Sequence, residues 1–289
     1  MRTGSETSLP TFDALARAPD DAIDLAVGAA LIARDVYEDL DVAGLIARLD
    51  ELAGPLGGGA LAGLPLLRQV EEVSQRFREL GFHGNVDDYY DARNSLLPDV
   101  LERRTGIPIT LTVVWCEIAR RAGVLARGVG FPGHFLARVD ELPALSGRDE
   151  DVPPVIVDPF AGGVVVGDDD ARALLRRTLG EGVELHPGLF APATTRATLV
   201  RMLTNLKAVW AGRGEHTKAF VAIDRIVSLV PDSARMLRER AGVAMRLGIH
   251  QLARADLTRV LELEPGAPDA GSIKKRLAEL EGSPRSLPN

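Results

Sequence analysis

The sequence contains only one cysteine, Cys116, in 289 residues. A single thiol excludes an internal disulfide and any metal site built on a CxxC pair. It is also typical of a reducing compartment, so we expect a cytoplasmic protein. The 5 histidines are scattered and no HExxH segment occurs, so the sequence predicts neither a metal site nor a cofactor.

Long apolar runs and clusters of basic residues are missing as well. No apolar run approaches the roughly 20 residues that a membrane span needs, and residues 1–20 lack the apolar core of a signal peptide. The net charge is −7 and the longest basic run is Lys274–Arg276. Nucleic-acid binding needs clustered lysine and arginine, so we expect neither nucleic acid nor membrane as a partner. An acidic chain slightly favours basic partners.

The remaining composition is that of an ordinary soluble globular protein, with 46% hydrophobic and 26% charged residues. Aromatic residues make up only 4%, so aliphatic residues and alanine must fill the core. A chain of this length can form two domains, each with its own core.

The first part of the chain reads as helical, after residues 1–10, which we expect to be disordered. Apolar residues at helical spacing predict four helices, over 20–36, 42–52, 66–80 and 96–104. The glycine-rich segment 54–63 lacks the GK[ST] ending of a phosphate loop, so we interpret it as a flexible linker. A fifth helix is predicted over 106–121, with Pro108 in its first turn. It is apolar around almost its whole circumference, which indicates a central, buried position.

Three strand-like runs follow this helix, Leu125–Phe131, His134–Val139 and Val155–Asp158. Helices followed by a small antiparallel sheet predict an α+β domain, which we place at residues 11–193. Beyond it no strand pattern occurs. Gly214 and Gly248, like Pro231 and Pro265, lie 34 residues apart.

A period of 34 residues in helix–turn–helix units is the signature of tetratricopeptide repeats. We therefore predict an all-α domain of helical hairpins at 194–281, followed by a loose tail at 282–289. The surface of such repeats predicts a protein or peptide partner.

The order of helix, strand with His134 and strand with Asp158 is the order of a papain-type or transglutaminase-type thiol enzyme. In such enzymes a cysteine at a helix start attacks the substrate, a histidine moves the proton and a carboxylate orients the histidine. Two simpler interpretations remain open. His134 can be a turn histidine after Pro-Gly, and Asp158 can form an Asx-turn with Pro159.

Four segments resemble the SirB-type proteins, a family with a transglutaminase-like core followed by tetratricopeptide repeats. They are NSLLPDVLERR (94–104), GIPITLT (106–112), GVGFPGHFLAR (128–138) and VDPFAGG (157–163). The resemblance implies that His134 and Asp158 match the histidine and aspartate of the superfamily, and it puts Pro108 where the nucleophilic cysteine belongs. On the matched segments we also predict three substrate-binding residues, Asn94, Gly133 and Phe135.

Proline carries no nucleophile, so the ordinary thiol mechanism is unavailable. Cys116 lies eight residues further along, roughly 12 Å down the helix axis, in an apolar run typical of an inert core cysteine. Thr110 and Thr112 are nearer the helix start, and a hydroxyl with His134 as base is conceivable. We therefore predict a catalytically degenerate protein that acts as a protein-binding or regulatory module. The alternative is an active amide hydrolase or acyl transferase that uses His134–Asp158 with a hydroxyl or water.

Overall fold

The structure is a computed structural model that describes residues 10–142 and 152–282, with side chains to residue 280. The predicted disordered N-terminus and loose tail lie outside this range, except for Pro10 and Gly282. Most of the charged loop 141–154 also lies outside it. The chain divides into two compact units, 1–202 and 203–289, which are described one at a time.

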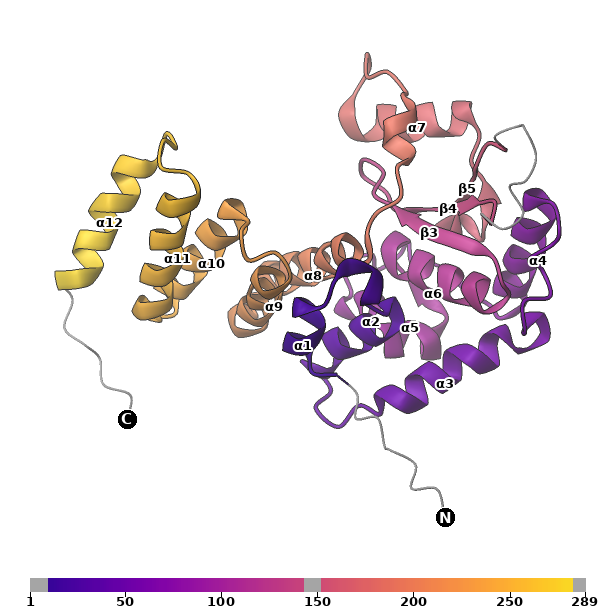
Figure 1. The fold of residues 1–289 in the computed structure, drawn as a ribbon, viewed down its shortest axis with the longest axis horizontal. Coiled ribbons are helices and arrows are strands. Elements are labelled where there is room, and N and C mark those ends of the chain that lie inside the picture. Colours follow the sequence, from indigo (N-terminus) through magenta and orange to yellow (C-terminus); the bar gives the residue numbers. More distant parts are fainter. Residues whose placement is uncertain (1–9, 143–151, 283–289) are drawn as a thin grey trace. The chain divides into compact units, whose positions relative to one another are not determined.

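The first half of unit 1 is helical (Figure 1). Its helices are α1 (Phe12–Arg17), η1 (Asp20–Ala22), α2 (Leu25–Arg34), α3 (Val42–Ala53), η2 (Gly54–Leu56), α4 (Leu66–Glu79), η3 (Ala92–Ser95) and α5 (Leu97–Arg103). Asp24 and Asp41 each accept a backbone N–H from the first turn of α2 or α3. These side-chain caps decide where the two helices begin. The single helix predicted over 20–36 is therefore two elements, η1 and α2.

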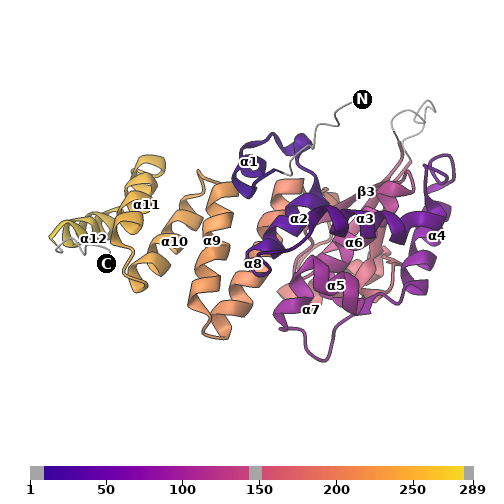
Figure 2. The ribbon, with the colours of Figure 1, turned by 90° about the horizontal axis from the view of Figure 1, so that it is seen from below.

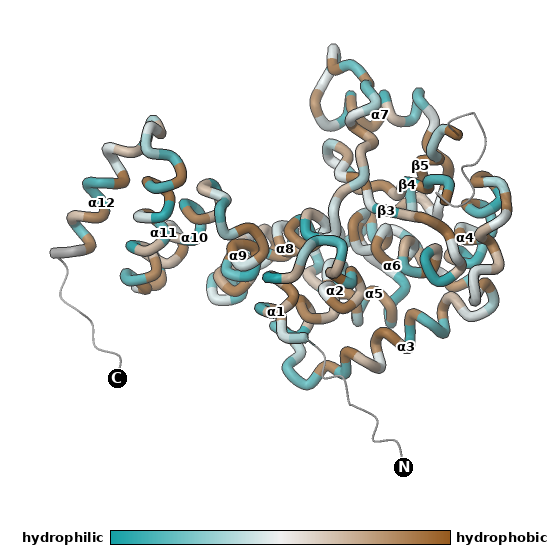
Figure 3. Tube along the Cα trace, viewed as in Figure 1, coloured by the Kyte–Doolittle hydropathy of each residue, from teal (hydrophilic) through white to brown (hydrophobic). Residues whose placement is uncertain are grey.

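Helix α6 (Pro108–Arg121) lies at the centre of unit 1, where every residue from Pro108 to Ala119 is buried. Apolar residues recur along α6 and the strands beside it (Figure 3). It contacts α3, α4, β3 and β4. Trp115 is fully buried and donates its indole N–H to Ser74 Oγ, 3.2 Å away. The predicted central position of this helix follows from its apolar circumference.

The sheet of unit 1 has the order β3-β4-β5-β6 and is antiparallel throughout. Its strands are β3 (Leu125–Val129), β4 (Leu136–Asp140), β5 (Val155–Asp158) and β6 (Val164–Val165). Val129 pairs with Leu136, and Ala137 pairs with Val157. Helix α7 (Asp168–Leu179) packs on it through Ala171 and Leu175. The predicted α+β class is confirmed.

Two details of the strands differ from the prediction. β4 begins at Leu136, so His134 lies in the preceding turn, where Gly133 takes a φ of +68°. No strand is predicted before residue 125, yet β1 (His83–Gly84) pairs in parallel with β2 (Thr105–Gly106). A two-residue strand has no periodicity to detect, so only the tertiary contact reveals it.

Unit 2 contains only helices among its described residues. They are α8 (Thr195–Gly212, which begins in unit 1), α9 (His216–Leu229), α10 (Ala234–Arg246), α11 (His250–Leu263) and α12 (Ala270–Gly282). Helices α9 to α12 follow one another as hairpins (Figure 2). Gly214 and Gly248 have almost the same positive φ, +74° and +75°. The same backbone conformation therefore recurs after 34 residues, at positions where a positive φ favours glycine.

Candidate active site

The side chains of His134 and Asp158 meet at one end of the sheet. His134 Nε2 lies 2.9 Å from Asp158 Oδ2. The backbone N–H of His134 donates to the carbonyl of Phe131 and closes the turn that carries His134. Asp158 is the last residue of β5. Adjacent antiparallel strands thus bring together two residues that are 24 positions apart in sequence.

Asp158 makes two kinds of contact at once. Its Oδ1 accepts the backbone N–H of Phe160, at 2.9 Å, and that of Ala161, at 3.4 Å. These bonds cap the short helix η4 (Pro159–Ala161). The Asx-turn interpretation and the pairing with His134 are therefore both realised, one by each oxygen.

The contact between the two side chains is close but not a directed hydrogen bond. Nε2 of His134 is shielded from solvent and has no partner in hydrogen-bonding alignment among the described residues, although Asp158 Oδ2 is 2.9 Å away. The Phe160 ring stands edge-on to the imidazole, with 6.0 Å between ring centroids. The aromatic ring and the carboxylate restrict the position of the imidazole.

The pair faces a cavity of about 520 Å³. Its lining residues are Val86, Tyr89, Pro108, Gly133, His134, Asp158, Phe160, Ala161, Leu174, Arg177 and Thr178. Pro108 is the first residue of α6. A helix start, a histidine and an aspartate therefore surround one space, which is the layout of a thiol acyl-transfer site. The residue at this helix start is a proline and not a cysteine.

The two threonines of α6 do not line this cavity. Thr110 is fully buried, and its Oγ1 donates to the carbonyl of Asn94 at 2.6 Å. The same hydroxyl accepts the N–H of Ile107 at 3.2 Å. Thr112 is 1% exposed and donates to the carbonyl of Phe135 at 3.1 Å. Both hydroxyls bond to backbone groups that position the cavity walls.

Of the three predicted substrate-binding residues, only Gly133 lines the cavity. Asn94 is fully buried, and its Nδ2 donates to the carbonyls of Asp88, at 2.7 Å, and Tyr89, at 3.3 Å. Phe135 is also buried. Asn94 thus supports the loop that carries Tyr89 at the cavity wall.

Comparison with known protein families agrees with this geometry. The model of the transglutaminase-like superfamily matches residues 44–204, and a tetratricopeptide repeat model matches residues 206–278. The chain belongs to the transglutaminase-like superfamily. The predicted order, a transglutaminase-like domain followed by tetratricopeptide repeats, is confirmed.

Relatives match along most of the chain. A UPF0162 protein of Xylella fastidiosa is 38% identical, over 94% of this chain and 95% of its own length. A UPF0162 protein of Pseudomonas aeruginosa is 32% identical, over 80% of this chain and 82% of its own. Human F-box only protein 21 is 30% identical over 60% of this chain, but over only 27% of its own length. No solved structure matches.

Three polar residues of the cavity wall are not indicated by any sequence motif. Arg177 and Thr178 come from α7, and Tyr89 comes from the loop before η3. Arg177 is exposed and forms no ion pair within the described part of the chain. Burial raises the pKa of the Tyr89 hydroxyl. These residues lie outside the matched segments, so the fold brings them to the site.

Cys116 lies outside this cavity. It is a free thiol, 5% exposed, and burial raises its pKa. A thiol is nucleophilic only as the thiolate, so Cys116 is poorly suited to act as a nucleophile. Among the described residues there is also no group of three or more His, Cys, Asp or Glu side chains that could hold a metal. Within the same ranges, none of the helices has the length and apolar character to span a membrane.

Proposed function

We propose that the transglutaminase-like domain has lost thiol chemistry and acts as a binding or regulatory module, joined to repeats that bind a protein partner. The observation that carries this proposal is Pro108. It is the first residue of α6 and lines the same cavity as His134 and Asp158. Thiol catalysis needs a cysteine at such a helix start, where the helix dipole lowers the thiol pKa. Proline supplies neither a nucleophile nor a backbone N–H.

The three side chains considered as replacements, Thr110, Thr112 and Cys116, do not supply this nucleophile. A nucleophile must lie within about 3.2 Å of its base or reach it through one water. The hydroxyls of Thr110 and Thr112 are buried and donate to backbone carbonyls. Cys116 contributes to a different cavity. The remaining function of His134 and Asp158 is to bind and orient a ligand.

The cavity has the composition of a ligand site. Apolar side chains of Val86, Phe160 and Leu174 line it together with a few polar groups. A volume of about 520 Å³ falls within the usual range for small-molecule or peptide sites, roughly 300–1,000 Å³. The unpaired charge of Arg177 and the His134–Asp158 pair supply the polar contacts that set specificity.

The repeats supply the surface for a macromolecular partner. Stacked helical hairpins present an extended face that suits a protein or peptide. We expect this partner in the cytoplasm, and we expect neither a nucleic-acid nor a membrane partner.

A second candidate rests on the intact pair. His134 and Asp158 lie 2.9 Å apart beside an open cavity, so His134 can act as base toward a water molecule. The chain would then be an amide hydrolase or acyl transferase without a protein nucleophile.

One set of full-length variants separates the two candidates. Arg235 and Arg246 are exposed on α10, so we would replace both with glutamate to change the repeat surface. His134→Ala changes the cavity, and Arg172→Glu on the exposed face of α7 is the control. Each protein is used for partner capture and for ammonia release from glutamine-containing peptides.

A partner that is lost with the α10 variant and retained by His134→Ala supports the proposal. The second candidate is established if the native protein releases ammonia and a stably folded His134→Ala protein does not. That result would overturn the proposal that the domain has lost catalysis.

A further inference from the structure

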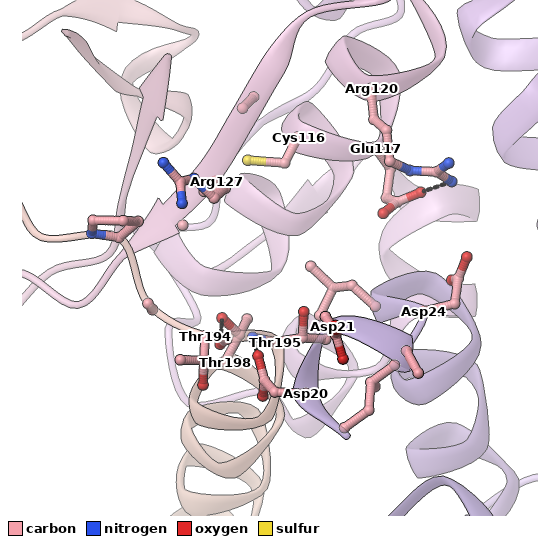
Figure 4. Close-up of a pocket in the computed structure, with 17 residues that line it drawn as sticks. Asp20, Asp21, Asp24, Cys116, Glu117, Arg120, Arg127, Thr194, Thr195 and Thr198 are labelled. Carbon is pink, nitrogen blue, oxygen red and sulfur yellow. Dashed lines mark hydrogen bonds and ion pairs between the residues drawn. The ribbon is translucent and has the colours of Figure 1, made fainter. Parts of the chain in front are cut away.

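Unit 1 contains a second cavity, of about 660 Å³, that shares no lining residue with the first. It lies between the C-terminal half of α6, strand β3, the η1 segment and the start of α8 (Figure 4). Its polar lining residues are Asp20, Asp21, Asp24, Cys116, Glu117, Arg120, Arg127, Thr194, Thr195 and Thr198. Cys116 is eight residues after Pro108, roughly 12 Å along the axis of α6. The two cavities are therefore separate sites on one helix.

Arg120, Arg127 and Glu117 line one side of this cavity, and the carboxylates of Asp20, Asp21 and Asp24 line the other. Figure 4 shows Arg120 and Arg127 on the side of α6 and β3, and the η1 carboxylates across from them. Each arginine uses one terminal nitrogen in an ion pair, with Glu117 at 2.9 Å or with Asp140 at 2.8 Å. A guanidinium has five N–H donors, so both arginines keep donors for a further anion.

The acidic side also keeps free oxygens. Asp21 is exposed and has no hydrogen bond or ion pair within the described ranges. Asp24 uses Oδ1 to cap α2, which leaves Oδ2 available. Asp20 is already engaged, because its two oxygens accept the N–H groups of Thr195 and Arg196. Asp21 and Asp24 are therefore the carboxylates that can meet a cation.

Uncharged groups also line the cavity. Cys116 lines it together with the apolar residues Ile23 and Ala126. Burial raises the pKa of the Cys116 thiol, so the sulfur carries no charge near neutral pH. A ligand that fits has a cationic end, a short uncharged middle and an anionic end.

We propose that this cavity binds a small zwitterion of amino-acid or dipeptide size. Its ammonium group contacts Asp21, and its carboxylate contacts Arg127. The middle of the ligand lies against Cys116. A neutral or singly charged molecule of the same size would leave one charged side without a partner, which costs affinity.

Cys116 is the only cysteine of the chain, so it reports on occupancy of the cavity. The test uses the full-length protein and the dipeptide alanyl-alanine in three forms: free, N-acetylated and C-amidated. We would follow labelling of Cys116 by methyl methanethiosulfonate with intact mass spectrometry, and measure binding by calorimetry. The free dipeptide should bind and slow labelling, and each capped form should bind at least about tenfold more weakly, since one charged contact is lost.

Three variants locate the site. Asp21→Asn and Arg127→Gln should each weaken binding of the free dipeptide by at least about tenfold. Arg177→Gln, in the other cavity, should leave it unchanged. Equal binding of the amidated and free dipeptides would indicate a site for amines and overturn the proposal. Absence of binding by calorimetry at millimolar dipeptide, with Cys116 labelled at the same rate, would overturn it as well.

Discussion

Asp158 uses one carboxylate oxygen to cap a turn and the other to contact His134. Oδ1 accepts the N–H of Phe160 at 2.9 Å, while Oδ2 lies 2.9 Å from His134 Nε2. The carboxylate is therefore held by the backbone and cannot rotate freely away from the imidazole. This double contact fixes the position of Asp158 relative to the imidazole.

Restoring a thiol should test how much of the thiol site remains. In a Cys116→Ala background, Pro108→Cys introduces a thiol at the start of α6. We expect its pKa to fall below the usual value of about 8.5, because the helix N-terminus favours the thiolate and the His134 imidazole can donate a hydrogen bond to it. The pH dependence of alkylation by iodoacetamide measures this pKa. Adding His134→Ala should raise the pKa of the introduced thiol. A pKa of about 8.5 or above in Pro108→Cys itself would show that the helix start and His134 do not act on this position.

The turn before His134 depends on glycine at position 133. Gly133 has a φ of +68°, and a Cβ there would overlap the side chain of Thr178. Gly133→Ala should lower the free energy of unfolding by about 1–3 kcal/mol, through backbone strain and steric overlap. Gly130→Ala is the matched control, since its Cβ would meet open space. Urea denaturation measures both, and equal stability of the two variants would contradict the prediction. Adding Thr178→Ala to Gly133→Ala should recover the part of the lost unfolding free energy that is due to steric overlap.

Thr110 is expected to be structural. Its hydroxyl donates to Asn94 at 2.6 Å and accepts from Ile107 at 3.2 Å inside the core. Thr110→Val keeps the shape but removes both bonds, and a long bond of 3.5 Å between the Ile107 N–H and the Asn94 carbonyl is what remains, so the free energy of unfolding should fall by about 1–3 kcal/mol. Any hydrolytic rate at saturating substrate should stay the same in the folded protein. A Thr110→Val protein of native stability that has lost a measurable hydrolytic rate would identify Thr110 as a nucleophile.

Asp91 should make part of the stability depend on acid pH. Its buried carboxylate accepts hydrogen bonds from the side chain of Arg93, which hold its pKa below the usual value. A carboxyl group whose pKa is lower in the folded state stabilises above its unfolded pKa, about 3.9, and loses this effect as the pH falls through the folded pKa. Asp91→Asn should therefore cost about 1–3 kcal/mol at pH 7 and progressively less below pH 4. Denaturation of both proteins across this range tests the sign; a cost that grows on acidification would refute it.

A buried ion pair should stabilise the repeats. Arg240 donates to both oxygens of Asp256, at 2.9 and 2.6 Å, and to Asp224 at 2.6 Å. The Asp256 side chain is 3% exposed, so Asp256→Ala removes the buried partner of Arg240, leaves it paired with the more exposed Asp224, and should cost up to about 3 kcal/mol. Asp232→Ala breaks an exposed pair with Arg259 and should cost at most about 1 kcal/mol. Hydrogen exchange of α9 to α11 measures both, and similar costs would mean that burial of the pair has no effect on stability.

The sequence alone determined the features that depend on local pattern. The apolar circumference of α6, with Pro108 in its first turn, predicts a central helix from periodicity and proline geometry. The 34-residue spacing of Gly214 and Gly248 predicts the repeats, since each repeat reproduces the same backbone turn. His134 and Asp158 follow that helix in the right order, which predicts the pair.

Only the tertiary structure decided which residues surround these positions. The contact between β1 and β2, the presence of Arg177 in the first cavity and the burial of Asn94 depend on segments distant in sequence that pack together. The opposed charges of the second cavity have the same origin, because η1 and β3 are about a hundred residues apart in the chain. Local periodicity reflects which face of an element is buried, but it does not specify which element covers that face. That choice depends on how all the apolar faces of the chain are buried together.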